Sequence, residues 1–297
     1  GGTASFTYGT GRFVVERFVK SARKWRFLSI PTTTTQTVKT AWQEGAANQA
    51  ANPVPGYGTQ IPSFFTDWGL RGFDNISAGG HSMKYWDEAT QAYIGQPNTS
   101  SAIASNKGYM LFIRGDRTVI GTAAATATTM RTRGPLKTGA VSVNYPSLAI
   151  NKFVSAGNPY ASAIDMRNVT RTNLSAMFYV WDPSLASSPY GGAYGLGAFQ
   201  LFTFDGTNYR VFPGSGNYGV ANSIDNNIES GAAFYLKTQA AGTSSVSFSE
   251  ASKTGGSRAV FRGGSFSNDA RFMNMLETFD DGGNPFILDG VMIDFND

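Results

Sequence analysis

Cysteine is absent from the 297-residue chain, and histidine occurs once, as His81. The lack of cysteine excludes a disulfide framework, a thiolate metal site and a cysteine nucleophile. A Ser-His-Asp triad would depend wholly on His81, and the sequence contains neither a G-x-S-x-G nor an H-E-x-x-H motif. We therefore interpret His81, which lies in the glycine-rich stretch 77–83, as an exposed loop residue. We expect a protein without catalytic residues.

Long apolar runs and dense charge are also missing. No segment approaches the roughly 18 apolar residues of a membrane helix, so we expect no membrane insertion. The net charge of +4, from 24 basic and 20 acidic side chains, is too dilute for a nucleic-acid-binding stripe. We interpret the densest basic run as the solvated face of a strand pair, with a patch for phosphate or acidic glycans as the alternative. This run contains Arg17, Lys20, Arg23, Lys24 and Arg26.

The composition that remains is typical of a turn-rich β-protein. The chain has 35 glycines and 22 phenylalanines, and 13% of its residues are aromatic. Short apolar or alternating runs recur between Gly, Pro, Asn and Ser residues, and each predicts a strand. The runs are 109–113, 141–143, 177–181, 199–204, 233–236 and 286–288. Residues 37–45 and 268–278 are candidates for short helices, and the second segment fits a strand as well.

A series of three motifs occurs twice along the chain. Each copy has a Phe-x-Ser segment that leads to a proline, then a Trp-Asp pair, then a glycine-containing segment that runs into a strand. The corresponding positions are Pro31 and Pro159, Trp86 and Trp181, and Gly108 and Gly231, at offsets of 128, 95 and 123 residues. Because the first and last offsets nearly agree, we infer a duplicated unit of roughly 125 residues with a long loop inserted at a different place in each copy.

The duplication predicts an all-β fold of two tandem, related, jelly-roll-like β-sandwich units. We expect the boundary near residues 134–138, where Arg133-Gly134-Pro135 interrupts a Thr/Ala-rich strand. Unit 1 then covers residues 1–136, and unit 2 covers residues 137–297 with a C-terminal strand extension. We predict that Trp86 and Trp181 occupy equivalent buried positions.

Paired carboxylates can hydrolyse glycosides without a histidine. Four acidic residues lie close together in the sequence, namely Asp67, Asp74, Asp87 and Glu88. Asp87 directly follows a tryptophan, however, and so does Asp182. We therefore interpret these two carboxylates as acceptors of backbone N–H groups in the turn that follows each strand.

Carboxylate and amide oxygens also cluster toward the end of the sequence. Calcium takes about six to eight such oxygens and is common in extracellular β-modules. The candidate ligands are Asp280, Asp281, Asn284 and Asp289. Their spacing does not match an EF-hand loop, and a hairpin turn is the better interpretation of Asp281-Gly282. No other cofactor is expected.

Two further groups of residues are candidates for binding. Aromatic rings in glycine-rich loops can stack on sugars, and Trp68, Tyr190 and Tyr194 are the candidates, with packing inside the protein as the alternative. Residues 119–130 carry no charge and favour a strand, and such a segment on a sheet edge is a template for another strand. We hypothesise self-association through Thr126 and Thr128, and pairing within the same sandwich is the alternative.

Taken as a set, six segments give the chain a family resemblance. They are Phe27-Leu-Ser-Ile-Pro31, 108–116, 157–162, 178–183, 228–231 and 248–253. The series resembles the stretch that commonly precedes the C-terminal sorting domain of type IX secretion cargo in large cell-surface proteins of Bacteroidota. The sorting domain itself is not in the sequence, so we expect the chain to be a portion of a larger protein.

The resemblance implies an extracellular, β-rich module at the cell surface, used in adhesion, gliding or extracellular assembly, with no catalytic residue to carry over. We expect a non-catalytic surface module with a structural or adhesive role, and a fibre or a larger adhesin is the candidate for the assembly that contains it. Its expected partners are itself, neighbouring copies and surface glycans. The alternative is a carbohydrate-binding module, or a glycoside-hydrolase accessory domain, of a secreted enzyme.

Overall fold

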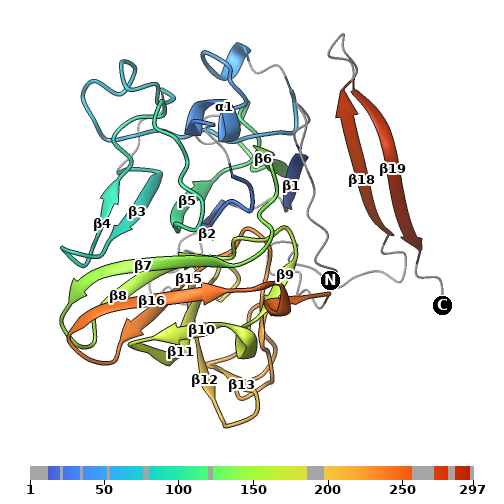
Figure 1. Ribbon diagram of the computed structural model, residues 1–297. Helices are drawn as coiled ribbons and strands as arrows, with labels where there is room; N and C mark the ends of the chain where they lie inside the picture. Colours follow the sequence, from blue (N-terminus) through green and yellow to red (C-terminus); the bar gives the residue numbers. More distant parts are fainter. Residues whose placement is uncertain are drawn as a thin grey trace.

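The computed structural model describes residues 13–20, 23–33, 36–51, 54–75, 80–119, 123–185, 197–255, 271–279 and 285–294. The chain is almost entirely β, and its named strands pair antiparallel (Figure 1), which confirms the predicted all-β class. The single α-helix of these residues, α1 (Val38–Trp42), lies in the first segment predicted to be helical, whereas the second overlaps strand β18 (Arg271–Phe279). None of the helices described here is long and apolar enough to span a bilayer.

The first part of the chain builds a four-stranded sheet and a two-stranded ribbon. The sheet has the order β2-β5-β3-β4, and β1 pairs with β6 in the ribbon. The 3-10 helix η1 (Gln49–Ala51) follows α1, which packs on β6. The strands are β1 (Phe13–Val19), β2 (Lys24–Leu28), β3 (Met83–Asp87), β4 (Ala92–Gly95), β5 (Tyr109–Ile113) and β6 (Thr128–Gly134).

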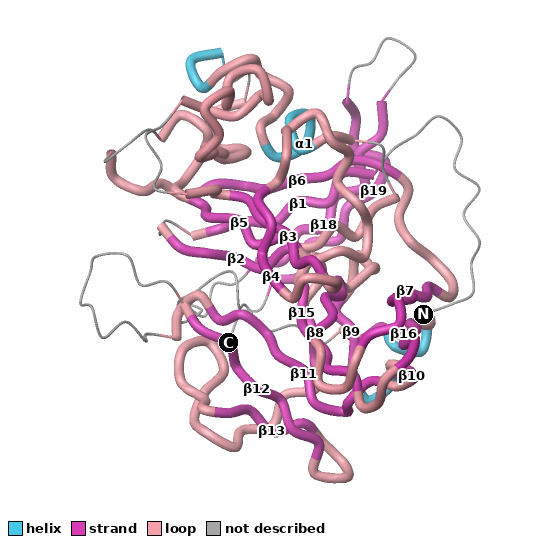
Figure 2. The backbone as a smooth tube through the Cα atoms, turned by 90° about the vertical axis from the view of Figure 1, so that its left-hand side faces the viewer, coloured by secondary structure: helices cyan, strands magenta, loops and turns pink. Residues whose placement is uncertain are grey.

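The second part builds a larger sheet with the order β13-β12-β11-β15-β8 and two three-stranded sheets, β10-β16-β7 and β14-β9-β17. Figure 2 shows β8, β15, β11, β12 and β13 running side by side. The elements are β7 (Val141–Leu148), β8 (Phe153–Gly157), β9 (Ala163–Asp165), η2 (Met166–Asn168), β10 (Thr170–Thr172), β11 (Leu174–Asp182), β12 (Ala198–Phe204), β13 (Tyr209–Phe212), β14 (Asn227–Ile228), β15 (Ala233–Thr238), β16 (Gly242–Phe248), η3 (Glu250–Ser252) and β17 (Lys253–Thr254).

The last two strands form a long hairpin. Strand β18 pairs with β19 (Pro285–Asp294), and β18 contacts β1. The segment between β6 and β7 connects the first part of the chain to the second. In it, Leu136 forms a β-bridge with Thr32, and the Gly139 N–H donates to Glu250 Oε1 at 2.6 Å. The predicted boundary between residues 136 and 137 falls inside this connection.

One continuous hydrophobic core runs through both parts of the chain. It extends from Val19 in β1, through Leu111 in β5, to Phe234 in β15 and Phe248 in β16, all at most 1% exposed. Burying a side chain of this size contributes roughly 1.5–3 kcal/mol. The two halves therefore stabilise each other through shared apolar packing.

The duplication inferred from the sequence corresponds to two sheets with matching strand order. The order β2-β5-β3-β4 matches β8-β15-β11-β12, and β13 extends the second sheet by one strand. Trp86 pairs with Tyr93 on the neighbouring strand, just as Trp181 pairs with Phe199. The two tryptophans occupy equivalent positions, although each is half-buried rather than fully buried.

The pairing of β5 with β3 and of β15 with β11 corrects the match between Gly108 and Gly231 that was inferred from the sequence. Tyr109 and Phe234 take the same place opposite β3 and β11, so the matched residues of β5 and β15 are 125 positions apart. Gly231 therefore matches Asn106 rather than Gly108. Both residues have left-handed backbones, with φ of 65° and 66°. Because asparagine tolerates this conformation, the same backbone conformation occurs in both units with a different residue in each.

Candidate functional site

The two related sheets pack against each other through an aromatic cluster, which we call the seam. Its centre is Tyr235, whose ring lies 4.8 Å from Phe27, 5.2 Å from Trp86 and 5.4 Å from Phe199. Aromatic rings dominate the energetics of such contacts because each buries a large area. The buried residues of the seam are Phe27, Met110, Ala233 and Tyr235, and the half-buried rings are Trp25, Trp86, Phe153, Tyr179, Trp181 and Phe199.

Hydrogen bonds cross the seam in matched pairs. The indole N–H of Trp86 donates to the carbonyl of Phe153 at 3.1 Å, and that of Trp181 donates to the carbonyl of Trp25 at 3.0 Å. Trp25 and Phe153 are themselves equivalent, because Trp25 pairs with Phe112 of β5 and Phe153 pairs with Lys237, the matching residue of β15. The seam thus has pseudo-twofold symmetry.

The backbone repeats this symmetry where main-chain hydrogen bonds join the two units. The Ser29 N–H donates to Gly231 O at 2.8 Å, and the Gly157 N–H donates to Asn106 O at 3.1 Å. Ser29 and Gly157 are equivalent positions. A Cβ atom at residue 157 would lie 1.8 Å from Ser29 Oγ. Glycine is required there because the segments around Ser29 and residue 157 meet without room for a second side chain.

Polar side chains at one end of the seam complete the contact. The Gln91 side chain acts like a neighbouring strand toward Phe153: Oε1 accepts from the Phe153 N–H at 2.7 Å, and Nε2 donates to its carbonyl at 2.9 Å. Glu88 Oε1 accepts from the Ser155 N–H at 3.2 Å. Glu88 is therefore used to hold the two units together.

The other acidic candidates also bind groups of their own chain. Asp74 is paired with Arg117 at 2.8 Å, and both side chains are sealed from solvent. Asp67 is paired with Arg71 at 2.6 Å in a partly exposed turn. Hydrogen bonds from Thr90 lower the pKa of Asp87, and the Thr90 N–H donates to its carboxylate at 3.0 Å.

Asp182 serves the same kind of purpose in the second unit. It accepts from the Ser184 N–H at 2.8 Å, from the Asn217 N–H at 2.9 Å and from the Asn217 side chain at 2.8 Å. The prediction that Asp87 and Asp182 accept backbone N–H groups in the following turns is confirmed.

His81 is half-buried, which differs from the exposed position expected from the sequence. Its Nδ1 lies 2.9 Å from Ser63 Oγ, and its ring lies 4.6 Å from Phe65. Burial lowers the pKa of His81, and the nearby Lys84 charge lowers it further. The ring therefore orders the loop that begins at Ser63.

The predicted sugar-binding and calcium-binding residues fall in different places. Trp68 is half-buried and packs against the core. Near it in sequence, Phe64 is 68% exposed and Leu70 is 93% exposed. Tyr190 and Tyr194, and the calcium candidates Asp280, Asp281 and Asn284, lie outside the described residues, and Asp289 is described only as part of the backbone of β19. Within the described part of the chain, no three His, Asp or Glu residues gather as a metal site would require.

The strand that contains Thr128 has neighbours on both sides. Thr128 pairs with Val19 of β1, is 1% exposed, and donates from Oγ1 to Gly58 O. On the opposite side of β6, the Gly58 N–H donates to Thr129 O at 2.9 Å. Thr126 Oγ1 accepts from the Asp116 N–H at 3.1 Å. Thr128 therefore does not lie on an open edge, and its strand pairs within the same unit.

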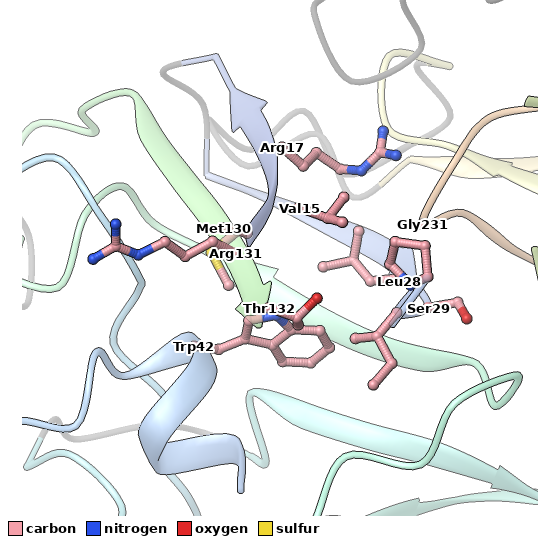
Figure 3. A pocket seen from close by; sticks show the side chains of 11 residues that line it. Val15, Arg17, Leu28, Ser29, Trp42, Met130, Arg131, Thr132 and Gly231 are labelled. Carbon is pink, nitrogen blue, oxygen red and sulfur yellow. The ribbon is translucent and has the colours of Figure 1, made fainter. Parts of the chain in front are cut away.

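A small pocket lies where the β1–β6 ribbon meets the second unit (Figure 3). Val15 and Arg17 of β1, Trp42 of α1 and Gly231 contribute to its wall. The neighbouring Arg131 is paired with Glu44 at 2.6 Å. The space is too small to admit a sugar residue. We therefore regard it as part of the junction between the units.

The basic run does not form a solvated strand face throughout. Arg26 is 4% exposed, and burial lowers its pKa to about 10, with the charge of Asp182 acting in the opposite direction. Successive side chains of a strand point to opposite faces of its sheet. Trp25 and Phe27 belong to the seam, so Arg26 between them points to the opposite, core side of the sheet. The alternation of aromatic and basic residues in β2 is the sequence signal that could have predicted this burial.

Comparisons of the chain with protein-family models, with curated proteins and with solved structures gave no match. The class of the protein is therefore defined by its own architecture, an all-β chain in which two related sheets meet at a pseudo-symmetric seam.

Proposed function

We propose that the protein is a non-catalytic extracellular surface module with a structural or adhesive role. The observation that carries this proposal is the seam, in which matched hydrogen bonds and a shared aromatic cluster join two related units into one body. A module at a cell surface must keep its shape under load and without disulfides, and such packing supplies that rigidity. The sequence resemblance to Bacteroidota surface proteins supports the same setting.

A carbohydrate-binding module of a secreted enzyme is the second candidate. It is favoured by the exposed Phe64 ring, which lies in the same turn-rich segment as Trp68. Exposed aromatic faces are the surfaces on which sugars stack. The two candidates share a role in adhesion and differ in the parent protein that carries the module.

Incubation of the purified protein with a panel of polysaccharides tests the proposal. We expect retention of polysaccharide on protein-coated beads without release of new reducing ends. Product release that disappears in Asp67→Asn or Asp87→Asn would instead establish an enzyme. Arg71 and Thr90, which bind these carboxylates, remain in both variants, and circular dichroism provides the control for folding.

A further inference from the structure

Strand β4 is the outer edge of the first sheet. It ends the order β2-β5-β3-β4 and lies at the left margin of the molecule in Figure 1. The Gln96 N–H donates to Met83 O at 3.0 Å, and hydrogen-bonded pairs alternate along an antiparallel ladder. The main-chain N–H and C=O groups of Tyr93 and Gly95 therefore point away from β3. Among the described residues, none bonds to these groups on the outer side.

The second unit closes the equivalent edge with an additional strand. β12 is the counterpart of β4, because the second residue of each strand pairs with the equivalent tryptophan. Leu201 is therefore the counterpart of Gly95, and it pairs with Phe212 of β13. The Val211 N–H of β13 donates in turn to Ser223 O at 3.0 Å, so the outer side of β13 is covered as well. The sheet architecture thus accepts a further strand at this edge, which the described residues of the first unit do not supply.

The sequence of β4 leaves the edge without the usual protection. Residues 89–106 contain no charged side chain. Tyr93 is 36% exposed and Ile94 is 38% exposed, so both faces of the strand present apolar surface. Edge strands of natural proteins are commonly guarded by a lysine, a proline or a bulge, and β4 contains none of these. The edge is therefore suited to pairing with another strand.

We propose that β4 pairs antiparallel with β4 of a second copy of the chain to form a symmetric dimer. With the twofold axis at Ile94, Tyr93 of each copy faces Gly95 of the other, and their outward N–H and C=O groups bond reciprocally. The uncharged segment 89–106 favours a copy of itself as the partner, because pairing brings no like charges together although the chain carries a net charge of +4. This inference rests on the proposed structural or adhesive function and names its partner.

Analytical ultracentrifugation of the whole protein tests the proposal. We expect the mass of the wild type to rise with concentration from that of one chain toward that of two. Ile94→Lys and Ile94→Glu should each remain monomeric, because like charges then meet at the axis. An equal mixture of the two variants should recover the dimer, because opposite charges face each other. Val220→Lys is the matched control, since Val220 is 78% exposed in the loop after β13 and its variant should dimerise as the wild type does.

Nuclear magnetic resonance of the wild type tests the pairing without a variant. The amides of Tyr93 and Gly95 should exchange with solvent more slowly as the dimer forms, whereas the Ile94 amide, which faces β3, should change less. His81 is the one histidine of the chain, and its ring lies against Gly95. Its signals should shift with concentration, because the Tyr93 ring of the second copy would lie beside Gly95 on the same face.

Circular dichroism should match the wild type in all three variants, because both substituted positions are exposed. A wild type that stays monomeric at every concentration, dimerisation of Ile94→Lys, or no recovery in the mixture would overturn the proposal. So would a monomeric Val220→Lys, because added charge elsewhere on the surface would then explain the loss. A monomer that still retains polysaccharide would overturn the dimer and leave the adhesive function standing. Release of new reducing ends by a dimer would overturn the non-catalytic function alone.

Discussion

The ion pair between Arg117 and Asp74 is the most deeply buried charge pair among the described residues. Arg117 also donates to the carbonyls of Gln43 and Ala46 at 2.5 and 2.7 Å, and Asp74 accepts from the Ile61 N–H at 2.9 Å. Asp74→Ala leaves the guanidinium buried without its counter-charge. We expect a loss of about 3–5 kcal/mol in the free energy of unfolding, measured by urea denaturation.

The matched control is Asp67→Ala, which removes the partner of Arg71 in an exposed turn. Solvent screens this pair and the side chains remain hydrated, so we expect no measurable change in the midpoint of unfolding. Similar losses in the two variants would show that burial does not decide the contribution of the charges.

At the scale of elements, β3 and β11 place equivalent tryptophans at the two rims of the seam. Trp86→Phe and Trp181→Phe each remove one indole N–H bond and part of a ring. The acceptor carbonyls keep a second donor, from Gln91 at Phe153 and from Arg26 at Trp25. We therefore expect each variant to lose a similar amount, about 1–3 kcal/mol, in chemical denaturation.

Trp68→Phe is the control for this comparison, because Trp68 packs outside the seam. It should lower the stability less than either seam variant. A large loss from one seam tryptophan and none from the other would contradict the pseudo-twofold arrangement.

At the scale of the whole molecule, the shared core and the seam couple the two units. Gly157→Ala would place a methyl group against the Ser29 side chain, where the two units are in contact. We expect a loss of about 1–3 kcal/mol, seen in calorimetry as one transition that moves to lower temperature without splitting.

Adding Ser29→Gly to Gly157→Ala should recover most of that stability, because it removes the side chain that the new methyl group would meet. Ser29→Gly alone measures the cost of losing the serine side chain. Two separate transitions in any of these proteins would show that the units fold independently, and no recovery in the double variant would show that contact with Ser29 is not the cause of the loss.

The sequence by itself determined the features that depend on local pattern. Alternating runs and turn residues predicted the β class, and the repeated motifs predicted that Trp86 and Trp181 are equivalent. The turn-capping roles of Asp87 and Asp182 also followed, because each carboxylate bonds an N–H only two or three residues away. Such contacts are fixed by spacing along one segment.

Only the tertiary structure decided which surfaces are covered. The burial of Arg26, the two neighbours of the strand containing Thr128, and the contact of Ser29 with Gly157 all join residues that are far apart in sequence. A period of two residues assigns side chains to two faces of a sheet but does not say which face meets another unit. That choice depends on long-range packing, and it buries Arg26 on the side of β2 opposite the seam.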